Sequence, residues 1–81
     1  MTDMMRLYVI KDRVAETNGP VFEAVNDGVA MRAFRSILAK EITSPDEYDL
    51  ILVGIINKKD LTLREEYKVV ANGSGAIPQD G

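Results

Sequence analysis

The chain contains no cysteine and no histidine. Without cysteine, neither a disulfide nor a thiolate metal site can form. Without histidine, the commonest general base and the commonest zinc ligand are missing, and no serine has a histidine to activate it. The acidic cluster at Asp46, Glu47 and Asp49 lacks the spacing of a calcium-binding loop. We therefore expect a protein that is not an enzyme and holds no metal and no cofactor.

Long hydrophobic runs are also missing. The most apolar stretch, residues 49–56, is far shorter than the roughly 18 residues of a membrane span. The first ten residues hold Asp3 and an apolar run broken by Arg6, which is not the pattern of a signal peptide. The sequence therefore predicts a cytosolic protein without a membrane segment.

A surplus of positive charge is absent as well. The chain has 10 lysines and arginines against 13 aspartates and glutamates, for a formal net charge of −3. This balance counts against strong, non-specific binding of nucleic acid, which normally requires a basic surplus. It leaves room for a local basic patch on an acidic molecule.

With 81 residues, the chain is long enough for one small domain and has no disulfide or metal to stabilise it. Small domains of this kind often gain core by pairing with a second copy, so we expect a homodimer. Residues 1–71 are predicted to form the domain. Residues 72–81 have the composition of a linker and are predicted to form a flexible tail.

The first half of the chain predicts strand, strand and helix. Residues 6–11 are rich in β-branched and aromatic residues and indicate a strand. Residues 20–25 follow a turn signal and indicate a short second strand or an extended loop. Asn26 or Asp27 can cap a helix from Val29 to about residue 40, because apolar residues recur there at helical spacing. That apolar stripe is Ala30, Ala33, Phe34, Ile37 and Leu38.

The second half predicts two further strands after a loop at residues 42–47. Residues 48–56 form the most apolar strand. Residues 61–70 alternate like a returning strand, although a short helix over 63–70 is a competing interpretation. The sequence thus predicts an α+β fold, with a small antiparallel or mixed sheet of three to four strands and one amphipathic helix, in the order strand-strand-helix-strand-strand.

The strand at 48–56 is apolar on both faces, and this bears on self-association. Alternation places Leu50, Leu52 and Ile56 on one face. It places Ile51, Val53 and Ile55 on the other. One helix covers one face only, so the second face needs another cover. We predict Ile51, Val53 and Ile55 as a dimer interface, with a role in the core of the same chain as an equal alternative.

Cations and tyrosines offer material for binding nucleic acid. Cations occur on the first strand, on the helix and in the last hairpin, and Tyr8, Tyr48 and Tyr67 could stack on bases. Acidic residues interleave with nearly every cation, so an ordinary solvated surface with tyrosines at the core margin is favoured by the residues alone.

Three segments carry a resemblance to a known family. They are RLYVIKDR at 6–13, GPVFEAVND at 19–27 and GVAMRAF at 28–34. This block resembles the start of the small nonstructural protein of gokushovirus-type microviruses, which are single-stranded-DNA phages of bacteria. The resemblance implies a DNA-binding protein, or a helper of single-stranded DNA synthesis, that acts in the host cytoplasm.

The resemblance and the clusters of cations lead to a functional hypothesis. The chain is predicted to be a phage accessory protein that binds single-stranded DNA during genome replication or packaging. The predicted nucleic-acid-binding residues are Arg6, Tyr8, Lys11, Arg13, Arg32, Arg35, Lys58 and Lys59. The alternative is a protein-interaction adaptor that engages a viral replication initiator or a capsid protein without binding DNA. A structural oligomer with no ligand is a third, weaker alternative.

Overall fold

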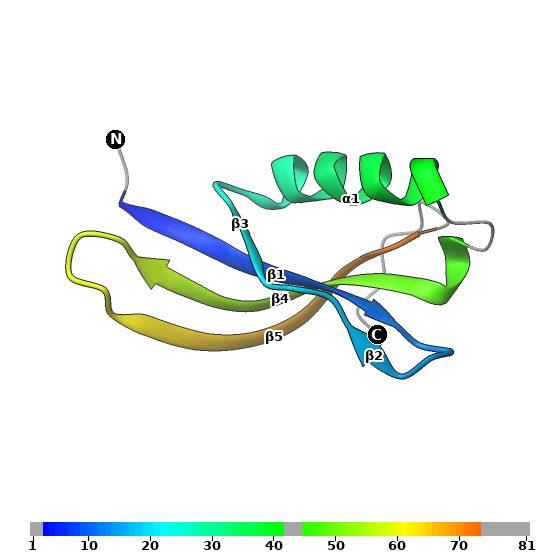
Figure 1. Cartoon of the computed structure of the whole chain (residues 1–81). Coiled ribbons are helices and arrows are strands. Elements are labelled where there is room, and N and C mark those ends of the chain that lie inside the picture. The colour runs from blue at the N-terminus through cyan, green and yellow to red at the C-terminus, as the bar shows by residue number, and fades with distance from the viewer. Residues whose placement is uncertain (1–2, 42–44, 74–81) are drawn as a thin grey trace, which may run out of the picture.

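The computed structural model describes residues 3–41 and 45–73, and it contains one long helix and one sheet (Figure 1). The elements in chain order are β1 (Met4–Asp12), β2 (Thr17–Asn18), β3 (Phe22–Ala24), α1 (Asp27–Glu41), the short 3-10 helix η1 (Pro45–Glu47), β4 (Tyr48–Asn57) and β5 (Leu63–Asn72). Helix α1 lies on one side of the sheet, and no helix of the described residues lies over the opposite side. The α+β class predicted from the sequence is confirmed.

The sheet is antiparallel throughout and runs in the order β2-β1-β4-β5, with β3 also paired to β1. It has five strands rather than three or four, because the segment between β1 and α1 pairs with β1 twice. The predicted second strand is limited to β3, and β2 was not predicted. Residues 63–72 form a strand, which decides against the competing helix.

Helix α1 begins where the cap was expected. The Asn26 side chain accepts a hydrogen bond from the backbone N–H of Val29 at 2.9 Å, as an N-cap residue does. Its predicted apolar stripe buries Ala30, Phe34 and Leu38 against the sheet. Ile37 belongs to the same predicted stripe but is 50% exposed, because it lies at the margin of the buried arc.

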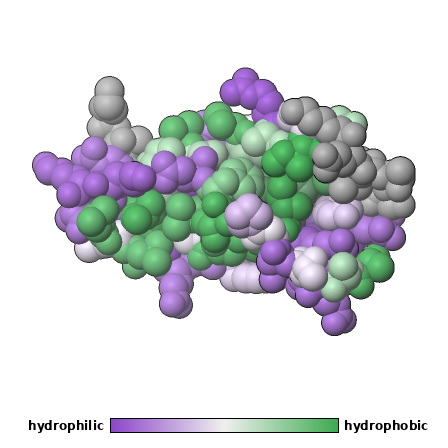
Figure 2. Space-filling model, viewed as in Figure 1, coloured by the Kyte–Doolittle hydropathy of each residue, from purple (hydrophilic) through white to green (hydrophobic). Residues whose placement is uncertain are grey.

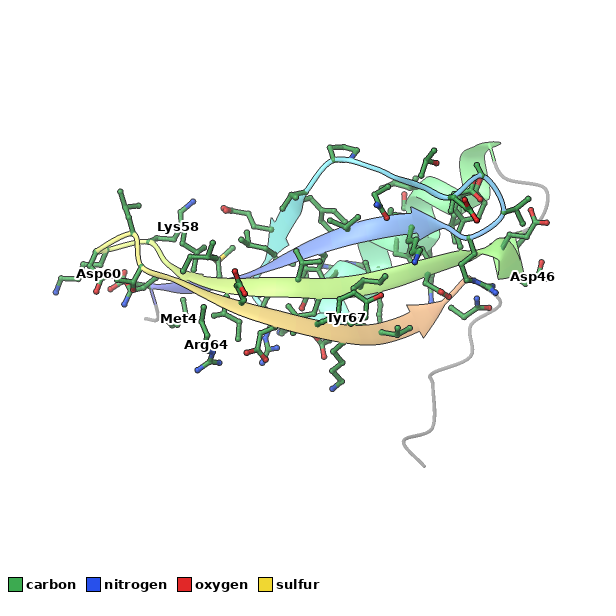
Figure 3. All side chains as sticks on the ribbon, turned by 90° about the horizontal axis from the view of Figure 1, so that it is seen from below. Met4, Asp46, Lys58, Asp60, Arg64 and Tyr67 are labelled. Atoms are coloured by element: carbon green, nitrogen blue, oxygen red, sulfur yellow. The ribbon has the colours of Figure 1, made fainter. Side chains whose placement is uncertain are left out.

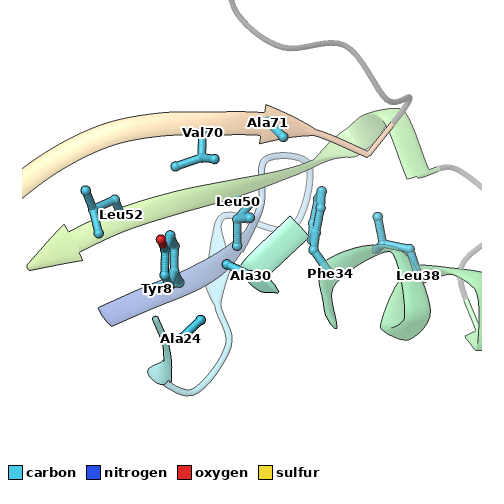
Figure 4. Packing of buried hydrophobic residues seen from close by; sticks show 9 residues of the cluster. All are labelled: Tyr8, Ala24, Ala30, Phe34, Leu38, Leu50, Leu52, Val70 and Ala71. Carbon is cyan, nitrogen blue, oxygen red and sulfur yellow. The ribbon is translucent and has the colours of Figure 1, made fainter. Parts of the chain in front are cut away.

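The core lies between α1 and the sheet (Figure 4). Tyr8 and Leu50 are fully buried, and Phe34 is 1% exposed. The same cluster contains the buried helix residues Ala30 and Leu38, together with Ala24, Leu52, Val70 and Ala71. These side chains place one face of β1 and β4 under the helix. Figure 1 shows that the β4–β5 turn extends beyond the helix.

An irregularity in β4 changes which residues share a face. On β4, Leu52 pairs with Tyr8, whereas Gly54 pairs with Leu7, so Val53 is an extra residue between two adjacent positions of β1. Beyond this bulge, Ile55 pairs with Arg6, which alternates onto the same face as Tyr8. The expectation that Ile55 shares a face with Ile51 and Val53 is therefore wrong. The bulge reverses the alternation for the rest of the strand.

Two predictions fall partly outside the described residues. Of the loop predicted at 42–47, residues 42–44 lie outside them, and residues 45–47 form η1. Of the flexible tail predicted at 72–81, residues 74–81 lie outside them. Asn72 is the last residue of β5, and its side-chain amide donates to the backbone oxygens of Asp46 and Tyr48.

Candidate nucleic-acid interface

Tyr8 belongs to the core, which corrects the expectation that its ring is available to a base. Its side chain has no exposed surface, and its ring lies on that of Phe22 with 5.8 Å between the centroids. The hydroxyl donates a 2.6 Å hydrogen bond to the Asp27 carboxylate. Burial first, and then this bond and the charge of Asp27, raise the pKa of Tyr8 above its ordinary value. A buried, protonated tyrosine fits a structural role.

Three of the predicted cations take part in ion pairs. Arg6 lies 3.8 Å from the Asp27 carboxylate. The Arg13 guanidinium lies 3.1 Å from the Asp49 carboxylate and also donates to the Asp46 backbone oxygen. Lys58 pairs with Glu23 at 3.0 Å. These contacts join β1 to α1, the turn after β1 to the start of β4, and the β4–β5 turn to β3, so the three cations have structural roles.

The four other predicted cations make no ion pair with another described residue, but they lie far apart. Lys11 is on β1, Arg32 and Arg35 are exposed on α1, and Lys59 is in the β4–β5 turn. Figure 3 shows Lys58 and Asp46, the contact of Arg13, at opposite ends of the sheet. The structure therefore does not bring the predicted set together in one surface.

A different set of residues does come together, on the sheet face away from α1, which we call the open face (Figure 3). A hollow of about 360 Å³ lies there, between the edge of β1 and β5. Its lining is mostly apolar, with one cation and one aromatic ring: Val9, Lys11, Asn18, Gly19, Val21, Ile51, Val53 and Tyr67. Tyr67 is 71% exposed, whereas Ile51, which lines the same hollow, is only 4% exposed.

Tyr67 is one of the three tyrosines that could stack on bases according to the sequence, but it is not among the predicted nucleic-acid-binding residues. Its signal is the alternation of β5, which places Leu63, Tyr67 and Val69 on the open face. Of the two remaining tyrosines, Tyr48 is half-buried beside the core. Tyr67 is therefore the most exposed aromatic side chain in the described part of the chain. It is the one best placed to contact a ligand.

A second, larger hollow of about 500 Å³ lies beside the helix. It is lined mainly by apolar groups of β1, the β2–β3 connection and α1, among them Ile10, Phe22 and Ile37. Figure 2 shows apolar residues across the middle of this view of the molecule, with polar residues toward its ends. This hollow is larger and more apolar than the hollow on the open face.

Four polar side chains line this recess, and two of them, Asp12 and Tyr48, have shifted pKa values. The Asp12 carboxylate accepts the backbone N–H groups of Ala15 and Val14, each at 3.0 Å. The bond from Ala15 is the main reason that the pKa of Asp12 lies below its usual value. Burial and a hydrogen bond with Asp12 raise the pKa of Tyr48. Around neutral pH, Asp12 is ionised and Tyr48 is protonated, which makes the pair a fixed polar rim on an apolar recess.

No helix in residues 3–41 and 45–73 combines the length and the apolar character that crossing a membrane requires.

Comparisons with known proteins give one match. Neither the search of curated proteins nor the search of solved structures found a match to the chain. A family model described as "Phage ORF5 protein" matches residues 5–75, which is most of the chain and includes α1 and every described strand except the first residue of β1. The chain therefore belongs to the phage ORF5 protein family.

Proposed function

We propose that this phage protein is a non-enzymatic accessory protein of a gokushovirus-type microvirus, and that it binds single-stranded DNA in the host cytoplasm during genome replication or packaging. The microvirus assignment and the genomic role rest on the resemblance of residues 6–34. The binding site that we propose differs from the one expected from the sequence. It is the open face, with Tyr67 and Lys11 as its main contacts.

The observation that carries the proposal is an exposed tyrosine beside a lysine on an uncovered sheet. Tyr67 is 71% exposed and borders the same hollow as Lys11. Sheet surfaces that bind single strands stack bases on exposed aromatic rings and hold the phosphates with nearby cations. Val9 and Ile51 give the hollow an apolar floor. This combination suits an unpaired base better than it suits a duplex.

The negative net charge of the chain limits how strongly it can bind DNA through phosphate contacts. With a net charge of −3, phosphate contacts cannot dominate, so affinity should be moderate and should come largely from stacking. Lys11, which makes no ion pair with another described residue, is the cation that borders the same hollow as Tyr67. Few phosphate contacts imply a shallow dependence of affinity on salt.

The test is a titration of a labelled single-stranded oligonucleotide at low and at moderate salt, followed by fluorescence anisotropy. Removal of one stacking ring should weaken binding about five- to one-hundred-fold, so Tyr67→Ala should bind far more weakly than the wild type. Tyr67→Phe keeps the ring and should bind nearly as the wild type does. Lys11→Gln should weaken binding and flatten the salt dependence.

Two outcomes would overturn this proposal. One is the absence of binding at low salt, where phosphate contacts are strongest. The other is equal affinity for Tyr67→Ala and the wild type, which would place any DNA site elsewhere. A labelled duplex of the same sequence serves as the control ligand and should bind more weakly than the single strand.

A protein-interaction adaptor is the second candidate function, and the apolar recess beside α1 favours it. Ile37 is half exposed at this recess, where an apolar side chain of a replication initiator or a capsid protein could be held. The test uses purified initiator and capsid protein after nuclease treatment. Binding that Ile37→Ser abolishes and Tyr67→Ala leaves intact would support the adaptor.

A further inference from the structure

The two edges of the sheet differ in how they are protected. On one side, β1 is followed by the two short strands β2 and β3, of two and three residues, with Gly19 and Pro20 between them. Short strands and proline discourage pairing with another chain. On the other side, β5 is ten residues long and contains neither glycine nor proline, and β4 is its only partner strand in the described part of the chain. Residues 63–68 of this edge are exposed.

We propose that β5 pairs antiparallel with β5 of a second copy of this chain, with Tyr67 at the two-fold axis. Pairing two identical edges into one continuous sheet requires a two-fold axis perpendicular to the sheet. Residues that face one another across the new ladder then lie on the same face of the sheet. Leu63, Glu65 and Val69 pair with open-face residues of β4, whereas Arg64 and Lys68 pair with helix-side residues, so the two faces of β5 still alternate across the register shift opposite Val53. Each register is therefore centred on one residue.

Charge selects the register. Arg64, Glu65, Glu66 and Lys68 are exposed on this edge. A register centred on Glu65, Glu66 or Lys68 places that charged residue opposite its own copy, which is unfavourable. Centred on Tyr67, the ladder places Glu66 of each copy opposite Lys68 of the other and brings the two tyrosines together. This register forms two attractive pairs and no repulsive one, so the edge is complementary to itself.

The neighbouring contacts agree with this register. Arg64 and Glu66 form an ion pair at 3.3 Å, which holds the Glu66 side chain on the face that Lys68 shares by alternation. Glu65 would lie opposite Val69, where it meets no charge. Both helices would lie on one side of the combined sheet, and both open faces would lie on the other. If the proposed DNA site is correct, the two copies of Tyr67 would form one stacking surface; the dimer itself does not depend on that site.

The test is the molar mass in solution without DNA, measured by light scattering and sedimentation over a range of protein concentrations. The wild type should be a dimer. Glu66→Lys turns two attractive pairs into two repulsive ones and should raise the dimer dissociation constant at least about tenfold. Glu65→Lys makes the same change in net charge one residue away and should leave the dimer intact. The double variant Glu66→Lys with Lys68→Glu restores complementarity and should restore the dimer.

Each outcome decides the proposal. A monomer at the highest soluble concentration overturns it, as does a dimer that Glu66→Lys leaves unchanged. Failure of the double variant to recover, with a folded circular dichroism spectrum, overturns the Tyr67-centred register. A dimer that is lost in Val53→Asp and kept in Glu66→Lys would place the contact on the open face. Because these masses are measured without oligonucleotide, failure of DNA binding leaves this test unaffected.

Discussion

At the scale of single residues, Tyr8 shows how one side chain links the sheet to the helix. Its ring fills the core against Phe22, and its hydroxyl bonds to Asp27 in the first turn of α1. Asp27 also lies 3.8 Å from Arg6 and places negative charge at the N-terminus of the helix, where the helix dipole favours it. The contacts of Tyr8 therefore stabilise the docking of α1 on β1.

Tyr8→Phe should lower the free energy of unfolding at neutral pH by about 1 kcal/mol, because the hydrogen bond to Asp27 is lost while the ring remains. The raised pKa of Tyr8 adds a pH dependence. The folded protein holds this proton more tightly than the unfolded chain, whose tyrosine pKa is about 10. The stabilisation is complete below pH 10 and is lost as the pH rises further.

The measurement is urea denaturation between pH 7 and pH 11. Stability should fall above pH 10 more steeply in the wild type than in Tyr8→Phe. Tyr67→Phe, at an exposed position, is the control and should follow the wild type. Equal slopes for the wild type and Tyr8→Phe would contradict the prediction.

At the scale of elements, a bulge determines which side chains of β4 lie on the same face of the sheet. Gly54 follows the extra residue Val53, and a side chain at this position has little room. A Cβ on Gly54 would lie 3.1 Å from the backbone oxygen of Arg64 and 3.3 Å from Cδ1 of Leu63. Glycine inside a strand commonly marks such a close approach. The bulge places Ile55 on the helix-side face and Ile56 on the open face.

Gly54→Ala should lower the free energy of unfolding by about 1–3 kcal/mol, because the neighbouring strand must shift to admit the methyl group. Gly28→Ala is the matched control. Its Cβ would lie 3.4 Å from the Asn26 side chain, in the first turn of α1, and alanine favours the helix. This control should leave stability unchanged or raise it by less than about 1 kcal/mol. Thermal denaturation of both variants is the measurement, and an unaffected Gly54→Ala would contradict the close approach.

At the scale of the whole molecule, one helix and one sheet enclose a small core. The fully buried large side chains are Tyr8, Phe34 and Leu50. The open face has no second layer among the described residues, and the edge at β5 has no neighbouring strand. Association with a second copy would stabilise a chain of this size, because it would bury the strand edge and apolar surface together.

If the protein dimerises through β5, its melting temperature should rise with protein concentration, because association favours the folded state by mass action. Glu66→Lys should show a melting temperature that changes little over the same range. Differential scanning calorimetry at several concentrations is the measurement. A wild-type melting temperature that is independent of concentration would contradict a dimer linked to folding.

The sequence by itself determined the types of element and their order. Local patterns were sufficient for this, because helical spacing around Phe34, the cap at Asn26 and the apolar run of β4 depend only on near neighbours. The family resemblance in residues 6–34 agrees with membership of a phage protein family. The predicted DNA-binding and dimer roles remain proposals.

Only the tertiary structure decided which sheet face the helix covers and which charged side chains remain available to bind a partner. Alternation divides β1 into two faces, but it does not say which face the helix covers, so Tyr8 was expected at the surface and lies in the core. The bulge that moves Ile55 is a property of strand pairing. The ion pairs of Arg13 with Asp49 and of Lys58 with Glu23 join residues far apart in the sequence. Such long-range pairings leave no local signal, and they determine which cations and which tyrosine remain free to meet a partner.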